Sequence, residues 1–408
     1  MIERTLSESI FSPQWGRQMR FIAGPRQSGK TTLAKEWLKS QGDLAFYYNW
    51  DDRALRSRFH HQHDFLKEDF LKAGTQKRHW VCYDEIHKMP GWKNILKAHF
   101  DAHEENTHFV ITGSARLDLF RRSGDSLAGR YFLFHLFPLN LFELSRKSKQ
   151  KLEFHSSAQA FIESRIARRE KETQSNFEGL FHFGGFPEPF LKGEDSFLKV
   201  WHRGYMDRLV REDLRDLTRI GSLENVAALM ALLPARVGSP LSLNSLREDL
   251  GVSHETVQNY LRALKLCYFI FEVPVYSKKI SRSIKKEKKF YFHDWSFIPE
   301  EAARFENYAA AELSNWISVW HDAGVGDFSL HYLRNREGKE CDFLIVKDGA
   351  PWFLVETKLK DREIHSSLPY FSRALGNLPA VQLVRQKGVL QASPDGIYCV
   401  SASRFFGA

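Results

Sequence analysis

The sequence predicts an α/β fold in which helices cover a parallel sheet. Helical stretches separate five apolar, strand-like runs near residues 19–23, 44–49, 80–84, 108–112 and 131–136. This alternation is typical of parallel sheets, because a helix usually forms the connection between neighbouring parallel strands. The chain has 408 residues, of which 43% are hydrophobic, so we expect about two to four domains with well-formed cores.

A glycine-rich turn follows the first of these strands. Residues 24–31 read Gly-Pro-Arg-Gln-Ser-Gly-Lys-Thr and fit the phosphate-binding pattern G-x-x-x-x-G-K-[ST], the P-loop. Backbone N–H groups of such a turn, and of the helix that begins there, point at phosphate oxygens. Lys30 would contact the β- and γ-phosphates of ATP, and the Thr31 hydroxyl would hold Mg²⁺. The nucleotide-binding residues that we predict are Gly24, Pro25, Arg26, Gln27, Ser28, Gly29, Lys30, Thr31 and Thr32.

Two further strand ends support the P-loop. The strand at 80–83 ends in Asp84-Glu85, where we expect Asp84 to hold Mg²⁺ and Glu85 to be the general base for the attacking water. The strand at 108–112 leads to Ser114, which would sense the γ-phosphate or orient the water; an ordinary hydroxyl at a strand end is the alternative. The position of Asp84, well downstream of the P-loop, suits those ATPases that insert a strand between the two motifs.

Charge and cysteine usage restrict the partners and the compartment. The net charge is +9 and the isoelectric point about 9.2, which favours anionic partners such as DNA. Four cysteines lie far apart in apolar runs without metal-ligand spacing, so we expect buried free thiols in a reducing compartment. The sequence has no apolar signal core and no uncharged apolar run of the roughly 18–20 residues that a membrane span needs. We therefore expect a cytoplasmic protein with no membrane partner.

The middle of the chain predicts helices and one compact motif. Residues 146–175 indicate a charged helix or linker, and residues 177–235 are helical with a Gly/Pro turn between helices. Within residues 236–283, a short helix, a turn at Gly251, a second helix and a strand follow a winged helix-turn-helix pattern. The second helix would either contact DNA or belong to a helical lid on the ATPase; its exposed candidates are His254, Glu255, Gln258, Asn259 and Arg262.

A strongly basic segment follows this motif. Residues 278–289 contain seven lysine or arginine residues and one glutamate, a net charge of +6. A loop with this charge would follow a phosphate backbone. A solvated run of charges is the alternative.

The C-terminal residues predict a second α/β arrangement. A helix near 302–320 is followed by three strands, a helix and a further strand, near residues 329–334, 340–346, 352–358, 363–375 and 380–385. The second and third strands carry the residues that point to chemistry.

Asp342 lies on the second of these strands, and Glu356 and Lys358, two residues apart and so on one face, lie on the third. Asp342 and Glu356 would hold a metal ion, and Lys358 would position a water or stabilise developing negative charge. Either Glu306 or Glu312 on the preceding helix would add a further acid, since a carboxylate on an apolar face needs a partner. Surface salt bridges on a small sheet are the alternative.

These motifs together resemble the prokaryotic AAA-type ATPases with an N-terminal AAA_14 domain and a C-terminal DUF4143 domain, over nearly the full length. The resemblance rests on residues 24–33, 84–88, 111–116, 126–130, 137–139, 305–308, 340–343 and 356–358. Family members often have Gln in place of His87 and Val in place of Cys341, which touches no proposed catalytic group. The resemblance implies a PD-(D/E)XK nuclease fold for the C-terminal part, and it implies that Arg130 senses or neutralises γ-phosphate charge.

We therefore expect an ATPase domain at 1–145, a helical linker or lid at 146–235, a winged helix at 236–283 and a nuclease-like domain at 284–408. The predicted function is ATP binding and hydrolysis in association with DNA, with metal-dependent cleavage by the C-terminal domain. The alternative is an ATP-regulated switch that binds DNA or protein without cutting, and a signalling ATPase without nucleic acid is a third reading. A homo-oligomer or a protein partner is compatible with each.

Overall fold

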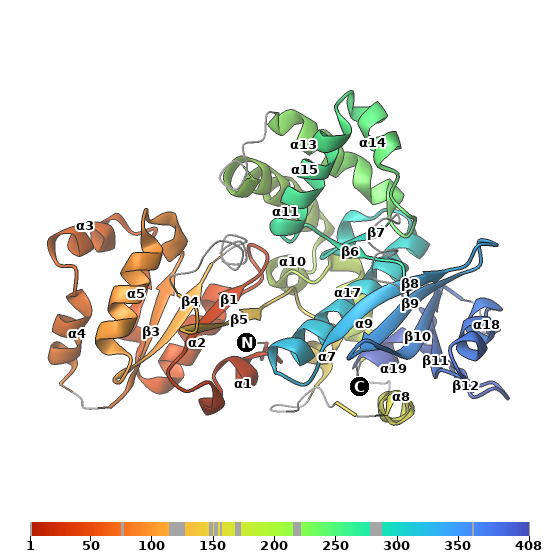
Figure 1. Cartoon of the computed structure of the whole chain (residues 1–408), viewed down its shortest axis with the longest axis horizontal. Helices are drawn as coiled ribbons and strands as arrows, with labels where there is room; N and C mark the ends of the chain where they lie inside the picture. Colours follow the sequence, from red (N-terminus) through yellow and green to blue (C-terminus); the bar gives the residue numbers. More distant parts are fainter. Residues whose placement is uncertain are drawn as a thin grey trace. The chain divides into compact units, whose positions relative to one another are not determined.

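The computed structural model describes residues 2–74, 77–113, 127–146, 150, 154–155, 157–167, 173–214, 222–277, 288–360 and 363–407. The chain divides into two compact units, Leu6–Phe137 and Met1–Thr5 with Pro138–Ala408 (Figure 1). The domain boundaries expected after residues 145, 235 and 283 stay predictions.

The first unit is built on a five-stranded parallel sheet, as the sequence predicts. Its strands are β1 (Met19–Ala23), β2 (Tyr47–Asn49), β3 (His79–Asp84), β4 (Thr107–Thr112) and β5 (Tyr131–His135). They are ordered β2-β3-β4-β1-β5, and every neighbouring pair is parallel. β4 lies between β1 and β3, so the expected inserted strand is present. The helices of this unit are α1 (Ser7–Ile10), α2 (Lys30–Gln41), α3 (Arg53–His61), α4 (Phe65–Ala73) and α5 (Trp92–His103).

The direction of these strands gathers their polar ends at one edge of the sheet. Every residue of β1 and β3 is buried, which is why both strands are near-continuous apolar runs in the sequence. In the register of the sheet Thr112 pairs with Asp84 on one side and with Ile22 on the other. The residues that follow β1, β3 and β4 therefore lie next to one another.

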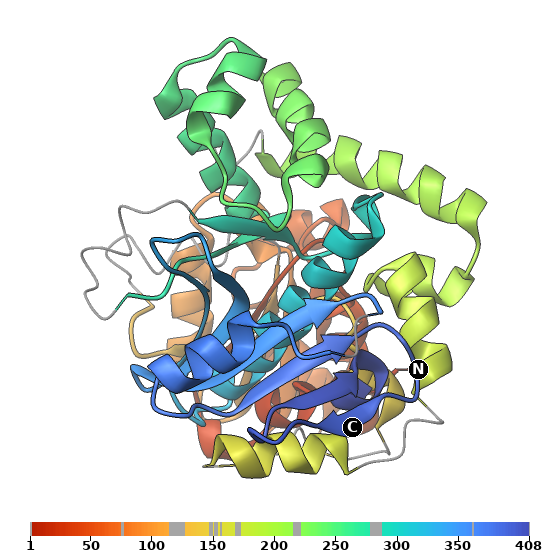
Figure 2. The same cartoon turned by 90° about the vertical axis from the view of Figure 1, so that its right-hand side faces the viewer.

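The second unit begins with a series of helices. They are α7 (Leu141–Ser145), α8 (Ala158–Ile166), α9 (Gln174–Phe183), α10 (Pro187–Lys192), α11 (Asp195–Arg208), a π-helix (Leu209–Leu214), α13 (Leu223–Leu232), α14 (Leu243–Leu250) and α15 (His254–Leu266). Figure 2 shows the green helices α13–α15 gathered at one end of this unit, away from the blue C-terminal sheet.

A helix, a turn, a helix and a β-hairpin follow one another at the predicted place. Gly251 ends α14 in the left-handed conformation, with φ 63°, and the Ser253 hydroxyl accepts the backbone N–H of Thr256 at 3.1 Å at the start of α15. The hairpin consists of β6 (Ile270–Val273) and β7 (Lys289–Phe292), which pair antiparallel. This order matches the predicted motif, and its identification as a DNA-binding winged helix stays a prediction. Most of the basic segment, residues 278–287, lies outside the described residues.

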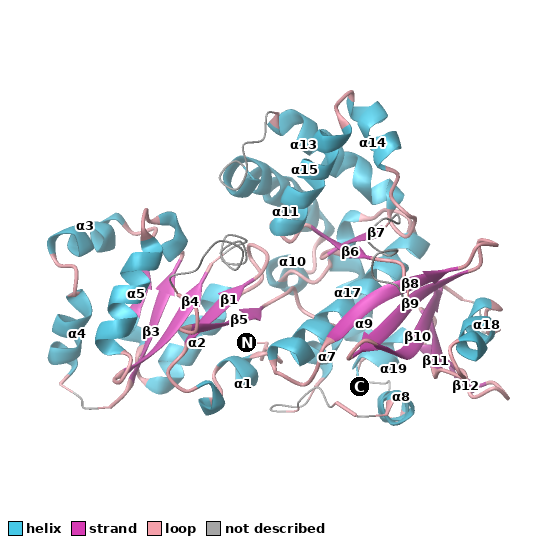
Figure 3. Cartoon of the chain, viewed as in Figure 1, coloured by secondary structure: helices cyan, strands magenta, loops and turns pink. Residues whose placement is uncertain are grey.

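The C-terminal part of the second unit is a mixed six-stranded sheet. Its strands are β8 (Phe328–Arg334), β9 (Glu340–Lys347), β10 (Ala350–Lys358), β11 (Ala380–Val384), β12 (Leu390–Ala392) and β13 (Tyr398–Ser401). The order is β12-β13-β11-β10-β9-β8. β8, β9 and β10 run antiparallel, and β11 runs parallel to β10. The helices are α17 (Glu301–Asp322), α18 (Ser367–Ala374) and α19 (Ala402–Gly407), and Figure 3 shows α17 and α18 on opposite sides of the sheet.

Aromatic packing holds α17 on its side of this sheet. The ring of Phe161 lies 5.7 Å from that of Trp316 and 5.4 Å from that of Trp320, between centroids. The Arg165 guanidinium stacks 4.6 Å from the Trp316 ring and donates to the carbonyl oxygens of Phe405 and Phe406. The long helix, α8 and α19 thus share one aromatic core.

The four cysteines are buried free thiols, as predicted; they are Cys82, Cys267, Cys341 and Cys399. Within the described part of the chain, none of the helices combines the length and the apolar character needed to cross a bilayer.

A buried carboxylate on α17 clamps the first residues of the second unit. Glu312 accepts the backbone N–H of Leu141 at 2.8 Å, and Asn315 donates to the carbonyl oxygen of Pro138 at 3.3 Å while accepting from Asn140 at 3.0 Å. Burial raises the pKa of Glu312 to about 8. Nearby Glu143 adds to this increase, and Arg165 and the Leu141 N–H oppose it.

The raised pKa of Glu312 predicts that the second unit loses stability as the pH rises from about 5 to 8. In the unfolded chain the group releases its proton near 4.5, so between the two pKa values the folded state binds one more proton. Glu312→Gln keeps the acceptor for Leu141 and removes the titration. We expect the melting temperature of the wild type to fall relative to the variant between pH 5 and 9, with Glu301→Gln on the exposed first turn of α17 as the control. Parallel pH profiles for the wild type and Glu312→Gln would contradict this.

Candidate functional site

The glycine-rich turn of the first unit has a backbone that requires glycine. Gly24 has φ +144°, and a Cβ atom there would lie 2.3 Å from the carbonyl oxygen of Leu136. Gln27 and Gly29 also have positive φ, 64° and 98°. Such a backbone turns successive N–H groups toward one concave side, which suits an anion. The strand, turn and helix that the P-loop pattern needs are therefore all present.

Lys30, the first residue of α2, folds back over this turn. Its Nζ donates to the carbonyl oxygens of Gly24 at 3.0 Å and Pro25 at 2.6 Å, and the side chain is buried. Backbone N–H groups of a helix start and one ammonium group thus meet at a single turn. This set of donors fits the phosphates of a nucleotide.

Asp84, at the end of β3, accepts hydrogen bonds from three hydroxyl groups. The donors are Thr31 at 2.8 Å, Tyr47 at 2.5 Å and Thr112. The structure therefore brings together the two residues that the sequence assigns to Mg²⁺, Thr31 and Asp84. A hydroxyl and a carboxylate beside a phosphate cradle are a donor set that fits this ion.

Two of these hydroxyl donors are residues that the sequence analysis missed. Tyr47 is the first residue of β2, and Thr112 is the last residue of β4, opposite Asp84 in the sheet register. A polar residue at the end of the strand next to β3 was the available signal for Thr112. No sequence signal pointed to Tyr47. It stands at the start of β2, whereas the site residues were sought at strand ends, and its long side chain carries the hydroxyl to Asp84.

Glu85 follows β3 in the left-handed conformation, with φ 59°, and its N–H donates to the carbonyl oxygen of Thr112 at 3.0 Å. Its carboxylate lies 3.2 Å from Lys88 Nζ and 3.5 Å from His87 Nε2. Burial raises the pKa of Glu85, and the charge of Asp84 adds to this increase while Lys88 opposes it. A carboxylate with a raised pKa is a stronger base at neutral pH, as the predicted role requires.

One other predicted residue, Arg130, does not join this site. Arg130 precedes β5, and its carbonyl oxygen accepts from the N–H of Met19 at the start of β1. It therefore lies at the edge of the sheet opposite the P-loop, where its guanidinium pairs with Asp101 of α5 at 2.9 Å. The expected contact of Arg130 with the γ-phosphate in its own chain is thus not supported, because strand direction carries it away from the P-loop. Ser114 lies outside the described residues.

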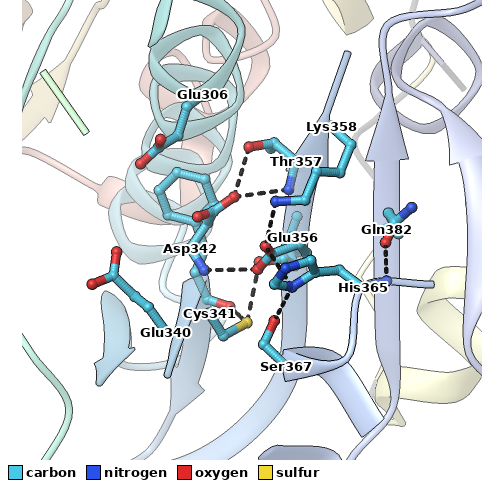
Figure 4. A network of polar contacts seen from close by, with 12 residues as sticks. Glu306, Glu340, Cys341, Asp342, Glu356, Thr357, Lys358, His365, Ser367 and Gln382 are labelled. Atoms are coloured by element: carbon cyan, nitrogen blue, oxygen red, sulfur yellow. Dashed lines mark hydrogen bonds and ion pairs between the residues drawn. The ribbon is translucent and has the colours of Figure 1, made fainter. Parts of the chain in front are cut away.

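The second unit holds a group of four acids that we call the carboxylate cluster: Glu306, Glu340, Asp342 and Glu356 (Figure 4). Glu306 comes from α17, Glu340 and Asp342 from β9, and Glu356 from β10. Asp342 accepts from the backbone N–H and hydroxyl of Thr357 at 2.8 and 2.7 Å. Glu356 accepts from the N–H of Asp342 at 3.2 Å. The structure therefore joins Asp342 and Glu356, as the sequence predicts.

Lys358 pairs with Glu356 at 2.8 Å, so both lie on one face of β10 as predicted. His365 Nδ1 lies 3.4 Å from the same carboxylate and was not predicted. In Figure 4 the Asp342 carboxylate turns toward Thr357, while Glu356 turns toward the Asp342 backbone and His365. Among the residues that the structure describes, no three His, Cys, Asp or Glu side chains converge as a metal-binding group.

Burial and mutual repulsion set the charge of this cluster. Burial, and next the charge of Asp342, raise the pKa values of Glu306 and Glu356, each to about 7. Lys289 opposes the shift at Glu306, and Lys358 opposes it at Glu356. Carboxylates that repel one another in this way are stabilised by neighbouring cations, which here are Lys289 and Lys358.

The partners of Glu306 and Glu312 show which of these two acids of α17 belongs to the cluster. The Asp342 charge acts on Glu306, whereas Glu312 is occupied by the N–H of Leu141. Glu306 is therefore the helix acid of this site, and Glu312 is structural.

Two family models match the chain. Residues 16–145 match AAA_14, an AAA domain, and residues 174–304 match DUF8612, a domain of unknown function. The chain therefore carries an AAA-type ATPase domain. The second match corrects the expected DUF4143: the short motifs quoted for that resemblance near Glu306, Asp342 and Glu356 lie beyond residue 304, outside both matched ranges.

The relatives cover both units. Over 372 residues the chain is 23% identical to "Uncharacterized protein MJ1544" of Methanocaldococcus jannaschii, a match that spans 88% of this chain and 79% of the relative. It is 21% identical over 346 residues to "Uncharacterized protein Rv2008c" of Mycobacterium tuberculosis, which spans 81% of this chain and 68% of the relative.

Solved structures show weaker likeness. The Aeropyrum pernix ORC1 protein in complex with DNA matches 76% of this chain and 92% of its own, with 13% identity and a TM-score of 0.29. AMPPCP-bound DnaA from Aquifex aeolicus matches 60% and 81%, with 14% identity and a TM-score of 0.30. Both scores are below 0.5.

Proposed function

We propose that this chain is a Mg²⁺-dependent ATPase that binds its nucleotide at residues 24–32. The observation that carries the proposal is the 2.8 Å hydrogen bond from the Thr31 hydroxyl to Asp84, beside the Lys30 ammonium and the Gly24 cradle. Bound there, Mg²⁺ would screen the phosphate charge and orient the γ-phosphate. The match of residues 16–145 to an AAA domain supports the same reading.

Each protein group then has a definite task. Lys30 contacts the carbonyl oxygens of Gly24 and Pro25 at 3.0 and 2.6 Å and would exchange them for phosphate oxygens. Glu85 accepts the proton of the attacking water at its carboxylate. To do so it must release Lys88, which also binds Asp51 at 2.7 Å.

Replacing Lys30 tests nucleotide binding. Lys30→Ala removes the one ammonium of the cradle, so we expect ATP–Mg²⁺ affinity to fall by roughly tenfold or more, since one charge-assisted contact is worth about 1.5–3 kcal/mol. Lys39→Ala, an exposed lysine on the same helix, is the matched control. Calorimetry on the full chain gives the affinities, and equal values for Lys30→Ala and wild type would refute the assignment.

Replacing Glu85 tests the general base. Glu85→Gln keeps the size and hydrogen-bonding of the side chain but cannot accept a proton, so we expect ATP binding to persist and hydrolysis to fall by about 10²-fold or more. Glu36→Gln on the exposed face of α2 controls for the loss of one acid. If Glu85→Gln hydrolyses ATP within a few fold of the wild type, the base lies elsewhere.

For the second unit we propose metal-dependent phosphodiester hydrolysis at the carboxylate cluster. Asp342 and Glu356 would hold the ion and Lys358 would stabilise the negative charge of the transition state. Support comes from the meeting of Asp342, Glu356 and Lys358 on adjacent strands, with Glu306 from α17 beside them. The alternative is an ATP-regulated switch that binds DNA or protein without cutting.

DNA is the partner that we propose for this activity. The net charge of +9 supports an anionic partner. The helix-turn-helix and hairpin formed by α14, α15, β6 and β7 supplies a surface of the kind that contacts DNA.

A cleavage assay separates the two functions of the second unit. With Mg²⁺ or Mn²⁺ we expect the wild type to nick plasmid, single-stranded or branched DNA, and Asp342→Ala to abolish cleavage while ATP hydrolysis persists. Glu337→Ala, in the exposed turn before β9, removes an acid outside the cluster and should cut like the wild type. Wild-type protein that binds these DNAs but never nicks them would favour the switch.

A further inference from the structure

Tyr47 contacts the acid of the nucleotide site from β2, a strand that carries no part of the P-loop pattern. Its hydroxyl donates to Oδ2 of Asp84 at 2.5 Å. In the register of β2 and β3, Tyr47 pairs with Cys82 and Asn49 pairs with Asp84. Tyr47 and Asp84 therefore point to one face of the sheet, because side chains alternate along each strand. The length of the tyrosine lets its hydroxyl reach forward to the carboxylate.

The helix that follows the P-loop lies on this face and holds the tyrosine ring. The ammonium of Lys35, on α2, lies 4.3 Å from the centre of the Tyr47 ring. Thr31, one turn earlier on α2, donates to the same oxygen of Asp84 at 2.8 Å. The ring of Tyr47 is thus held by α2, and its hydroxyl meets the Thr31 hydroxyl at one carboxylate oxygen.

Three hydroxyl groups fill most of the hydrogen-bonding capacity of Asp84. Thr31 and Tyr47 donate to Oδ2, and Thr112 donates to Oδ1. A carboxylate has about four lone-pair sites, so both sites of Oδ2 are occupied. The orientation of the carboxylate is therefore fixed at both oxygens, by residues from α2, β2 and β4.

These contacts bring no positive charge to Asp84. The residue is 4% exposed, and its three hydrogen-bond donors are neutral hydroxyls. A buried carboxylate held by neutral donors favours a cation in its vicinity. Asp84 differs in this respect from the carboxylate cluster, where Lys289 and Lys358 pair with the acids.

We propose that Tyr47 is a positioning residue for Mg²⁺ in the nucleotide site. With Thr112 it fixes the Asp84 carboxylate, which accepts the proton of the Thr31 hydroxyl and so turns the Thr31 oxygen into a ligand for the ion. A hydroxyl has one proton and two lone pairs, so Thr31 can donate to Asp84 and bind Mg²⁺ at the same time. Partners that orient a metal ligand in this way are worth roughly 10- to 100-fold in metal affinity. The inference rests on the proposed Mg²⁺-dependent ATPase function.

The test measures the affinity of the full chain for a non-hydrolysable ATP analogue, in chelator and over a series of free Mg²⁺ concentrations. Tyr47→Phe removes the hydroxyl and keeps the ring. We expect the Mg²⁺ concentration at half of the gain in affinity to rise about tenfold, while the affinity in chelator stays within about twofold of the wild type. In ATP hydrolysis we expect the same rise in the Mg²⁺ requirement, with kcat at saturating Mg²⁺ close to the wild-type value.

Tyr48→Phe is the matched control. Tyr48 is the next residue of β2, on the opposite face of the sheet, and its hydroxyl donates to Asp69 at 2.8 Å. The change removes the same kind of hydrogen bond, from a tyrosine to a carboxylate, away from the nucleotide site. It should leave the Mg²⁺ requirement at the wild-type value even where the melting temperature falls.

A second pair of variants keeps the test decisive if Tyr47→Phe folds poorly. Thr112→Val removes the donor to the other carboxylate oxygen at nearly the same shape, and it should raise the Mg²⁺ requirement in the same way. Thr112→Ser keeps the hydroxyl and should retain the wild-type requirement. A role of Thr112 in packing alone would give the opposite order.

A Mg²⁺ requirement of Tyr47→Phe equal to that of the wild type would overturn the proposal and leave Tyr47 as a packing residue. An equal loss of affinity with Mg²⁺ and in chelator would also overturn it, because Tyr47 would then support the phosphate cradle and not the ion. Wild-type affinity that does not respond to Mg²⁺ is a separate result: it would refute the Mg²⁺ dependence of the proposed ATPase, and with it the premise of this inference.

Discussion

The parallel register of β1, β4 and β3 is the constraint on which the nucleotide site depends. Because Thr112 is paired with Ile22 and with Asp84, the turn after β1 and the acid of β3 reach the same edge of the sheet. Thr31 can then contact Asp84 at 2.8 Å across 53 residues of sequence. A shift of one residue in either pairing would turn the Asp84 side chain to the other face of the sheet.

The long helix α17 imposes a comparable constraint on the second unit. Glu312 and Asn315 hold the chain that follows the first unit, and Glu306 projects into the carboxylate cluster from the same helix. The two acids are six positions apart, and burial raises the pKa of each. Their partners differ: the Leu141 N–H and the Tyr308 hydroxyl act on Glu312, whereas Lys289 and Tyr291 bind Glu306. Two glutamates of one helix therefore have different roles: Glu312 contributes to packing, and Glu306 belongs to a charged cluster.

The sequence was sufficient for the features that local pattern encodes. Apolar runs located the strands of both sheets, and the P-loop pattern with its strand and helix located the phosphate cradle. It was insufficient where a partner comes from a distant element. Tyr47 and Lys289 belong to no sequence motif that would predict their contacts. Arg130 was assigned from a motif, but the direction of β5 places it at the edge of the sheet opposite the P-loop.

The burial of all four native thiols has a practical consequence. Thiolates are the reactive form, and enclosure raises the pKa values of Cys82 and Cys341 well above normal. Maleimide dyes would therefore react with an introduced surface cysteine in preference to the native ones. Two introduced surface cysteines would therefore accept a donor and an acceptor dye in a chain that retains its own four.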